Sequence, residues 1–568
     1  MVTKYRRLRE ALPAEIVEEL KVYPELTRKL LFSRGISTLP EAERFFAPNY
    51  EEDVHDPFLL KGMEKAVKRI LKAIEQKEKI LVYSDYDADG IPGGIILKEF
   101  FECIGYSNFQ NYIPHRHDEG YGLNNEAVET FAKEGVNLII TVDCGVADYG
   151  QITLAQSLGV DVIVTDHHEL NGKIPPAYVI LNPKQKNCPY PFKELCGAAV
   201  VFKLVQALIK TGDFSWKNGR EKWFLDLVGM ATLSDMVSLT GENRAFAHYG
   251  LKVLRKSPRP GLQKLWRKLG VDQRFLTEDE VVFSLSPRIN AASRMGHPVD
   301  AFRLLSTGDH VEADQVSDYL NKVNDERKGV VASIVKDIKK NLNMRAQLSS
   351  VLVLGNPQWK PALLGLAATS VVEDFGRPVF LWGRNGENDL KGSCRSDGSV
   401  NLVSLMESVK DSFLQFGGHK LAGGFSVSHE KVHSLEEELS QAYGSVAGER
   451  EEENLWIDEK IRLDDVDESL FKQIDKFSPF GASNPKPIFL FEDVRPKGVK
   501  QFGKTKNHLE ISFENSKGTL VKAISFFAKP DSFSNKPEEG KSVNLVATLE
   551  KSFFRNFPEL RLRVVDII

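Results

Sequence analysis

Hydrophobic runs that end in acidic or polar residues recur through the first half of the chain. Between residues 55 and 245 they alternate with stretches of helical periodicity. The runs are ILVYSD (80–85), LIITVD (138–143), VDVIVTD (160–166) and YVILNP (178–183). Continuous apolar strands separated by helices are typical of a parallel sheet covered on both faces. Such sheets bind ligands at the carboxyl ends of their strands, where Asp85, Asp143 and Asp166 are expected.

The pattern changes outside this first domain. Residues 1–54 are predicted to form a charged helical segment, and 246–345 a helical connector. Within the connector, 310–342 has the periodicity of one long amphipathic helix that could bridge two lobes. A second α/β domain is expected over 346–447, and short strands with turn signals over 455–568 indicate an OB-like β-barrel. The predicted fold class is multidomain α/β, with a parallel sheet first and a barrel last.

Composition narrows the class of protein. The chain has 568 residues, 42% hydrophobic and 27% charged, which suits roughly three to four soluble domains. It shows no membrane-length apolar run and no signal-peptide core, and its five cysteines form no CxxC pair. We therefore expect a cytoplasmic protein that neither binds a membrane nor relies on disulfides or a zinc ribbon.

Charge is unevenly distributed along the chain. The net charge is −4, which excludes a globally basic nucleic-acid coat protein, yet residues 471–568 hold 17 Lys and Arg against 11 Asp and Glu. Thirteen Phe are interspersed there. A basic, aromatic-rich barrel is a reasonable platform for single-stranded nucleic acid, although most of these Phe side chains are expected to be core.

The strongest chemical motif is SDYDADG (84–90). Asp85, Asp87 and Asp89 alternate where a strand gives way to a loop, which would place Asp85 and Asp87 on the same side. Two carboxylates there would repel each other unless a cation lay between them, and oxygen ligands suit Mg²⁺ or Mn²⁺. For this motif alone, a solvated acidic turn is an equal alternative.

Three further motifs carry candidate ligands. TDHH places His167 and His168 at a strand end, and a neutral imidazole is the commonest metal ligand. Asp166 could orient a histidine or cap the next helix. VDCG contributes Asp143, and MATLSDMV contributes Asp235, an acid in an apolar helix-like run that requires a metal, an Arg or a helix cap as its partner.

Together these motifs describe one site. The candidate ligands come from separate turns of the predicted sheet: Asp85, Asp87, Asp143, His167 and Asp235. Carboxylates with an imidazole and no thiol indicate a hydrolytic site for hard cations. Two such ions can activate water and stabilise the leaving oxygen of a phosphodiester.

The order DYDADG, VDCG, DHH, SD resembles that of the DHH phosphoesterase superfamily. Later segments are similar to the signatures of its RecJ family, the bacterial exonucleases that act 5′→3′ on single-stranded DNA. These segments are SPRINAASRMG (286–296), LNKVNDER (320–327), KGSCRS (391–396), FGGHKLAGG (416–424) and SPFGASNPKP (478–487). The resemblance runs from about residue 35 to 568. The chain departs from the family pattern at IPGG (91–94), at Cys394 and in WKPALLGLAATS (359–370).

The resemblance implies roles for individual residues. One Mn²⁺ or Mg²⁺ ion would be held by Asp87, Asp143, His167 and Asp235, and a second by Asp85 and Asp143. Asp89 and His168 complete the catalytic motifs, with His168 near the scissile phosphate. The residues implied in substrate binding are Ser393, Arg395, Arg288 or Arg294, Gly418, His419, Lys420 and Tyr121. For Tyr121, stacking on a base and packing in the core are equal alternatives.

The implied activity is two-metal hydrolysis of single-stranded DNA, 5′→3′, to 5′-mononucleotides, in DNA repair and recombination. A monomer is expected, with single-strand DNA-binding protein and a RecQ-type helicase as partners, and the long helix and barrel would close a channel around one strand. A short-oligonucleotide or cyclic-dinucleotide phosphodiesterase is the nearest alternative, but such relatives usually lack the barrel. A pyrophosphatase and a non-catalytic replication scaffold are weaker alternatives.

Overall fold

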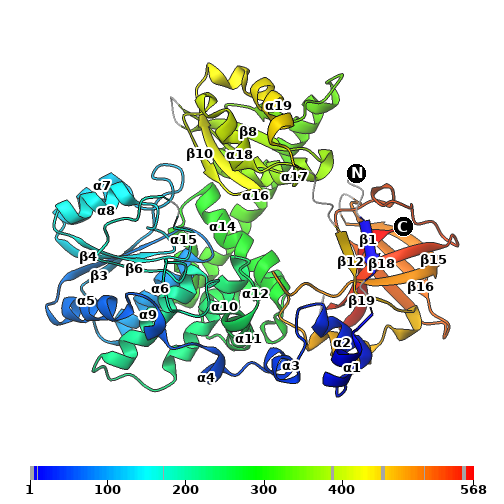
Figure 1. The fold of residues 1–568 in the computed structure, drawn as a ribbon, viewed down its shortest axis with the longest axis horizontal. Coiled ribbons are helices and arrows are strands. Elements are labelled where there is room, and N and C mark those ends of the chain that lie inside the picture. The colour runs from blue at the N-terminus through cyan, green and yellow to red at the C-terminus, as the bar shows by residue number, and fades with distance from the viewer. Residues whose placement is uncertain are drawn as a thin grey trace.

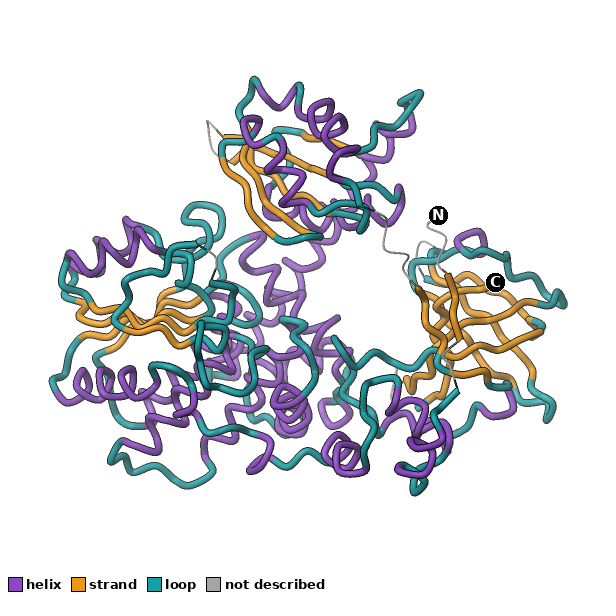
Figure 2. The backbone as a smooth tube through the Cα atoms, viewed as in Figure 1, coloured by secondary structure: helices purple, strands orange, loops and turns teal. Residues whose placement is uncertain are grey.

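Three lobes, each built on a β-sheet, surround a set of helices in the computed structural model of the chain (Figures 1 and 2). The structure describes residues 5–8, 11–170, 172–385, 389–448, 454–503, 506–552 and 558–568. The predicted fold class is confirmed. Within the described ranges, no helix is both long and apolar enough to cross a membrane.

The first lobe contains a five-stranded sheet in which all neighbours are parallel. Its strands, in spatial order, are β3 (Phe109–Tyr112), β2 (Lys79–Ser84), β4 (Val136–Val142), β5 (Asp161–Thr165) and β6 (Val179–Leu181). The chain order reverses between β2 and β4. The carboxyl ends of these two strands therefore form a topological switch point, the usual ligand position in such sheets.

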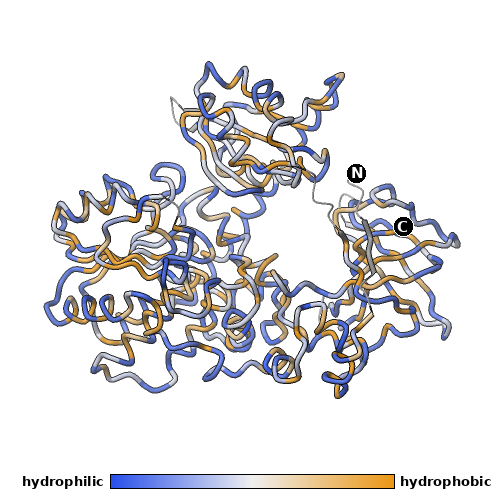
Figure 3. Tube along the Cα trace, in the orientation of Figure 1, coloured by the Kyte–Doolittle hydropathy of each residue, from blue (hydrophilic) through white to orange (hydrophobic). Residues whose placement is uncertain are grey.

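Helices cover both faces of this sheet, as the apolar strands require. One face packs on α5 (Met63–Glu75), α6 (Gly90–Cys103) and α9 (Gly197–Thr211). The other packs on α7 (Asn125–Lys133) and α8 (Tyr149–Ser157). Alternate residues of β2 belong to the two cores, Val82 to the first and Leu81 to the second. Hydrophobic colouring follows these strands in Figure 3.

A helical connector follows the first lobe. It comprises α10 (Leu225–Ser234), α11 (Gly241–Leu254), α12 (Pro260–Leu269), α13 (Glu278–Glu280), the π-helical turn η4 (Val281–Leu285), α14 (Ser286–Met295), α15 (Val299–Ser306) and α16 (His310–Asn343). Val316 and Leu320 of α16 belong to the first-lobe core, whereas Ile334 and Ile338 belong to the second-lobe core. The long helix bridges two lobes, as its periodicity predicted.

The second lobe has a mixed five-stranded sheet. Its strands, in spatial order, are β10 (Gln415–Gly418), β11 (Ala422–Val427), β9 (Asp389–Arg395), β8 (Val379–Asn385) and β7 (Leu352–Gly355). Helix α17 (Pro361–Phe375) packs with α16 on one core, and α18 (Leu402–Ser408) with α19 (Leu435–Val446) on the other. The glycine-rich β10–β11 hairpin lies at one edge of this sheet.

The third lobe has a seven-stranded, mostly antiparallel sheet. Its strands, in spatial order, are β13 (Glu459–Lys460), β14 (Phe489–Val494), β18 (Val543–Ser552), β19 (Glu559–Ile567), β17 (Leu520–Ser525), β16 (His508–Glu514) and β15 (Pro496–Phe502). Helix α20 (Glu468–Asp475) packs against it. Phe489, Phe491 and Phe513 are fully buried, so these rings are core, as expected for most of the Phe side chains.

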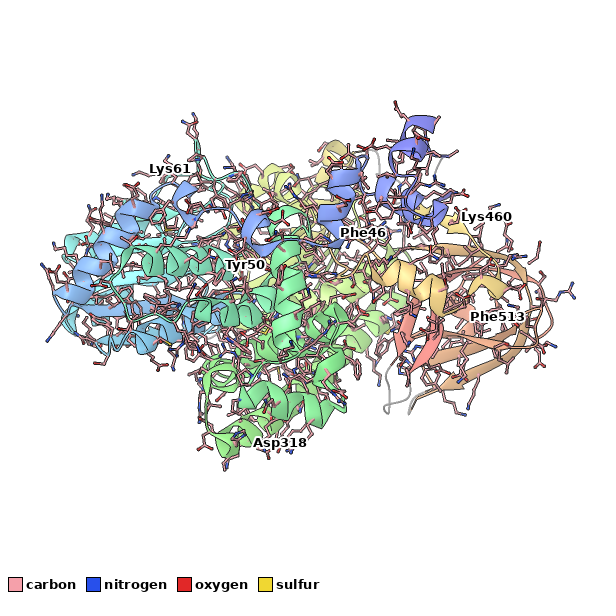
Figure 4. All side chains as sticks on the ribbon, turned by 90° about the horizontal axis from the view of Figure 1, so that it is seen from below. Phe46, Tyr50, Lys61, Asp318, Lys460 and Phe513 are labelled. Atoms are coloured by element: carbon pink, nitrogen blue, oxygen red, sulfur yellow. The ribbon has the colours of Figure 1, made fainter. Side chains whose placement is uncertain are left out.

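The N-terminal segment packs on the third lobe before it enters the first. Its helices are α1 (Ala14–Glu19), α2 (Glu25–Phe32), α3 (Leu39–Phe46) and α4 (Tyr50–Asp53). Leu30 and Leu31 share a core with the C-terminal strands, and the ring of Phe46 lies 5.0 Å from that of Phe477. From below, Phe46, Tyr50 and Lys61 follow this segment across the molecule (Figure 4).

The prediction that the N-terminal segment is helical is wrong for residues 5–8. Residues Tyr5–Leu8 form β1, which pairs in parallel with β12 (Asn454–Ile457). Local periodicity could not show this strand, because its partner lies at the other end of the chain.

Candidate metal centre and phosphate site

Three strand ends meet at the switch point of the first sheet. Asp85 follows β2, Asp143 follows β4, and Asp166 and His167 follow β5. All four side chains are buried. The parallel sheet therefore brings together acids that are far apart in sequence, as expected from the strand pattern.

Among the described residues, three overlapping sets of side chains can each converge on one ion. The sets are Asp85 with Asp87 and Asp143; Asp143 with His167 and His168; and Asp89 with His167 and Asp235. Within each set the ligand atoms lie within 4.8 Å of one another. His167 Nε2 lies 3.2 Å from Asp143 Oδ1, 3.7 Å from Asp89 Oδ2 and 3.6 Å from Asp235 Oδ2.

The carboxylates of this cluster destabilise one another when charged. Burial, followed by the charge of Asp87, raises the pKa of Asp85 well above its usual value. Burial and the surrounding aspartates raise the pKa of Asp143 in the same way, and burial with Asp89 raises the pKa of Asp235 to about 8. Crowded carboxylates of this kind are stabilised by a cation placed between them.

Buried polar atoms without hydrogen-bond partners also indicate a cation site in this cluster. Asp85 Oδ1, Asp143 Oδ1 and His167 Nε2 have no hydrogen-bond partner among the described residues. Buried polar atoms usually have partners, so these three require an explanation. Carboxylate oxygens and one imidazole nitrogen are a donor set that Mg²⁺ or Mn²⁺ can use. The residues present therefore fit a divalent-cation centre.

Backbone geometry holds Asp143 in place. This residue has φ +60°, a left-handed conformation that is uncommon for a residue with a side chain and often marks a functional position. The Tyr121 hydroxyl donates to the Asp143 carbonyl at 2.9 Å. At Gly197 a β-carbon would lie 2.6 Å from the Asp143 Cβ, so glycine permits the close approach of α9. Tyr121 is 47% exposed and is not core; whether it stacks on a base stays a prediction.

Asp166 orients one of the two histidines. Its Oδ1 accepts hydrogen bonds from the backbone of His167 and His168, and lies 2.8 Å from His168 Nδ1. Burial opposes the charged form of His168, but the hydrogen bond and charge of Asp166 raise the pKa of His168 to about 9. Burial and the charge of His168 lower the pKa of His167 to about 3, so this ring is neutral, the form that binds metals.

Two positional expectations need correction. Strand β2 ends at Ser84, so Asp87 reaches the cluster through a turn rather than through strand alternation; its Oδ1 accepts from the amides of Asp89 and Gly90. Asp235 caps the carboxyl end of α10 instead of lying inside a helix or at a turn of the sheet. The helix ends there because Met236 adopts φ +56°.

Asp89 has a more central position than the resemblance implied. It groups with His167 and Asp235, where Asp87 was expected, and Asp87 groups with Asp85. Both Asp89 oxygens also accept from the first amides of α9, at 2.6 Å from Gly197 and 2.7 Å from Ala198. Asp89 therefore ties the DYDADG loop to the helix that supports Asp143.

Arginines gather beside the carboxylate cluster. Burial and the charges of Arg116, Arg327 and Arg395 lower the pKa of Arg294 to about 9. Arg327 Nε is buried and has no hydrogen-bond partner within the described ranges. Arg294 Nη1 donates to the carbonyl of Ala362 on α17, so the group lies between α14 and the second lobe. A phosphate placed among these guanidinium groups would offset their mutual repulsion, and their planar donor pairs match phosphate oxygens.

The second lobe contributes the other predicted substrate residues. Arg395 Nη1 donates to the Cys394 carbonyl at 2.8 Å, and a β-carbon at Gly365 would lie 2.8 Å from Arg395 Nη2. Ser393 precedes it on β9, paired with Gly424. The Gly418–His419–Lys420 turn joins β10 to β11 with both side chains exposed, and its contact with phosphate stays a prediction. Arg288 instead donates to Asn321 and to the carbonyl of Ser284.

Sequence reasoning missed three residues of this region. Arg116 lies 4.7 Å from the centre of the Tyr86 ring, and its charge opposes the raised pKa of Asp85 that burial produces. Asn290 accepts from the Ala88 amide at 3.0 Å and so supports the DYDADG loop. Arg116 lies five residues before Tyr121, while Asn290 and Arg327 lie within SPRINAASRMG and LNKVNDER. These segments were the available signal.

Comparisons with known proteins identify three domain families along the chain. Residues 79–232 match the DHH family N-terminal domain, 343–445 the DHHA1 domain and 457–566 the RecJ OB domain. The single-stranded-DNA-specific exonuclease RecJ of Bacillus subtilis is 34% identical over 507 residues, which is 89% of this chain and 63% of that protein. The Escherichia coli RecJ is 29% identical over 585 residues, covering 98% of this chain and 96% of that protein. The chain belongs to the RecJ family.

A solved RecJ structure has the same arrangement of domains. RecJ of Thermus thermophilus in complex with Mn²⁺ superposes with a TM-score of 0.81 at 25% identity, over 100% of this chain and 79% of that one. One departure from the RecJ pattern also has a physical reason. At Gly93 in IPGG a β-carbon would lie 2.6 Å from Val142 Cγ1, so α6 packs directly on β4.

Proposed function

We propose that the protein is a divalent-metal-dependent exonuclease that degrades single-stranded DNA 5′→3′ to 5′-mononucleotides. One observation carries this proposal: a carboxylate–histidine cluster with unsatisfied buried atoms lies beside a group of mutually repelling arginines. The first suits the hydrolysis of a phosphodiester and the second the capture of a terminal phosphate. The names of the Bacillus and Escherichia relatives support the same substrate.

The metal would be Mn²⁺ or Mg²⁺, as in the Thermus structures. We infer that two ions are held by residues of the cluster: Asp85, Asp87, Asp143, His167 and Asp235, with Asp89 beside them. When bound, such ions activate water and stabilise charge on the leaving 3′ oxygen. The chain's own contribution is to fix these side chains in place through Tyr121, Gly197 and the α9 amides.

His168 would act on the scissile phosphate. Asp166 holds its ring, and the Tyr121 hydroxyl lies 3.3 Å from its Nδ1. A cationic imidazole in that place would stabilise the negative charge that develops on the phosphate oxygens. No covalent intermediate with the protein is required.

The arginine group would select the end of the strand. Arg294, Arg395 and Arg116 supply planar donor pairs that match phosphate oxygens, and Ser393 adds a hydroxyl nearby. A 5′-terminal phosphate held there would place the first phosphodiester at the carboxylate cluster. This geometry would set both the 5′→3′ direction and the release of single nucleotides.

A surface of the third lobe supports binding of a longer strand. Phe527 is 83% exposed and Phe526 37% exposed. Their rings flank His508, with centroids 5.0 and 5.3 Å from it, and the Arg563 guanidinium lies 4.1 Å from the Phe526 ring. We call Phe526, Phe527, His508 and Arg563 the aromatic patch. Bases stack on such rings without sequence preference.

The other expectations about partners stay predictions. They concern single-strand DNA-binding protein, a RecQ-type helicase, a monomeric state and a cytoplasmic location. The channel around one strand is likewise a prediction.

A short-oligonucleotide phosphodiesterase is the second candidate, because it would use the same cluster. A digestion assay with Mn²⁺ separates the two. We would compare a long 5′-phosphorylated single strand labelled at either end, the blunt duplex and a five-nucleotide oligomer. The proposal expects rapid release of the 5′ label as mononucleotide with the duplex spared. Cleavage confined to the oligomer would favour the second candidate, and no cleavage with metal bound would favour a scaffold.

A further inference from the structure

A largely apolar cavity of about 220 Å³ lies at the junction of the connector and the third lobe, and Met236, the residue after Asp235, is part of its lining. Its walls come from three segments: the end of α10 with the loop after it, the α13–η4 run, and the loop 480–486. Leu233, Leu239 and Phe480 form buried parts of the wall. None of the functions assigned above uses this cavity.

Two large apolar side chains at the rim of the cavity are exposed to solvent. Phe283 is 73% exposed and Met236 67% exposed, although both line the cavity. Phe283 lies in the π-helical turn η4, where the Ser286 hydroxyl donates to the Val281 carbonyl at 2.8 Å. Met236 is held at φ +56°. Turns of this kind are rare and cluster at functional sites.

The walls are preformed and tied to each other. The Leu239 amide donates to the Ala482 carbonyl at 2.9 Å, which joins the loop after α10 to the third lobe. Lys486 forms an ion pair with Asp279, which joins the third lobe to α13. The cavity therefore does not depend on a mobile side chain to stay open.

Both rim residues are close in sequence to residues of the candidate catalytic region. Met236 follows Asp235 in the chain. Phe283 is followed in the same helical run by Asn290, which holds the DYDADG loop, and by Arg294. The cavity wall is therefore joined to Asp235 by one peptide bond at Met236, and to Asn290 and Arg294 by the run from η4 into α14.

We propose that this cavity receives one base of the DNA strand, next to the scissile phosphate, with Phe283 as its stacking partner. The inference rests on the proposed function and adds to it a base-binding site. The occupant is a nucleobase because the volume accepts a flat ring system, the walls are mostly apolar with charged groups at Glu278, Asp279 and Lys486, and the exposed Phe283 ring lies at the entrance. Stacking of this kind accepts any base, as an exonuclease that advances along a strand requires.

The test uses 5′-phosphorylated strands that carry a single abasic site at successive positions from the 5′ end. In the unaltered protein, one position slows nucleotide release about tenfold, within the range for loss of one stacked base. Phe283→Ala raises the KM for intact DNA about tenfold with kcat little changed, and abolishes the extra slowing at that abasic position. Phe283→Trp restores both properties.

Phe275→Ala is the matched control, because Phe275 is 50% exposed in the same connector but does not line the cavity. It should leave the abasic profile unchanged. The proposal is overturned if Phe283→Ala keeps the profile of the unaltered protein, or lowers kcat equally for intact and abasic strands. Absence of any digestion by the unaltered protein would instead contradict the proposed function.

A binding measurement separates failure of the cavity proposal from failure of the proposed function. A strand with 2-aminopurine at the sensitive register is bound to the Asp143→Asn variant, in which cleavage is blocked. If combining Phe283→Ala with Asp143→Asn abolishes the quenching of 2-aminopurine fluorescence, the result supports the cavity as a base site. Equal quenching with and without Phe283 overturns it, whatever the activity of the enzyme.

Discussion

Asp166 Oδ1 lies 2.8 Å from Nδ1 of His168, and it also accepts the backbone amides of both histidines of the DHH motif. One carboxylate oxygen therefore fixes the loop and the ring that it carries. Residues that orient a catalytic or ligating histidine commonly affect activity almost as much as the histidine itself.

Asp166→Asn should lower kcat by about 10- to 100-fold, because the amide cannot hold both the loop and a charged ring. The loss is measured by the rate of mononucleotide release at saturating DNA. Asp161→Asn, at the other end of β5, is the control and should retain activity. Equal losses in the two variants would indicate a general effect of β5 on stability.

Asp143→Asn should abolish nuclease activity and also raise the melting temperature of the metal-free protein. The substitution removes one charge from a cluster whose carboxylates repel one another. Mn²⁺ should stabilise the unaltered protein more than the variant, because a ligand that binds the folded state stabilises it. Thermal unfolding with and without Mn²⁺ checks this. Asp318→Asn, at an exposed position on α16, is the control. Mn²⁺ should stabilise this variant as much as it stabilises the unaltered protein.

Arg395→Lys should reduce the preference for 5′-phosphorylated over 5′-hydroxyl ends by about tenfold, since an ammonium cannot replace the planar guanidinium pair. The comparison of kcat/KM for the two kinds of end measures it. Arg267→Lys is the control, because Arg267 is exposed and pairs with Asp314 on the surface. An unchanged preference in Arg395→Lys would remove Arg395 from the end-binding site.

Phe527→Ala should weaken the binding of strands long enough to reach the third lobe by about tenfold, consistent with loss of one stacked base. Cleavage of a five-nucleotide oligomer should not change. Fluorescence anisotropy against strand length gives the measurement. Leu520→Ala, 58% exposed at the opposite end of β17, should have no effect. Weaker binding of short and long strands alike would contradict a separate contact on the aromatic patch.

Glu278 should make stability depend on pH. Burial, partly opposed by Lys486, raises the pKa of Glu278 from 4.5 to about 7. The folded state thus holds this proton more tightly than the unfolded state, so stability is highest below pH 4.5 and is lost as pH rises through about 7. Glu278→Gln should remove about 1–3 kcal/mol of this loss. Denaturant unfolding at about pH 5.5 and 8 compares the two proteins, and parallel pH profiles would contradict the assignment.

The convergence of the carboxylates with His167 could be predicted from sequence, because most of these residues lie in local patterns. Asp85 and Asp143 end apolar runs, and the rule that parallel strands present their carboxyl ends together brings them to one edge. Asp235 was found for its acidity in an apolar run, yet its place at the end of α10 depends on Met236 turning left-handed. A sequence pattern does not show that backbone state.

The arginine group could be predicted less completely. Arg327 and Arg116 belong to a long helix and to a loop, where a lone Arg usually forms a surface ion pair. Their closeness to Arg294 depends on how α16 and the first lobe pack, which no local pattern contains. The cavity beside Phe283 was missed for the same reason, since its walls come from three distant segments.

The pairing of β1 with β12 and the packing of α2 against the C-terminal strands set an order of folding. During synthesis, Leu30 and Leu31 leave the ribosome long before the third-lobe strands that cover them. At about 5–20 residues per second, they wait roughly 25 to 100 s for those strands. The first lobe can fold meanwhile, whereas the N-terminal helices must remain uncovered or be shielded by a chaperone. Helix α2 thus reaches its native place only after the third-lobe strands have been made.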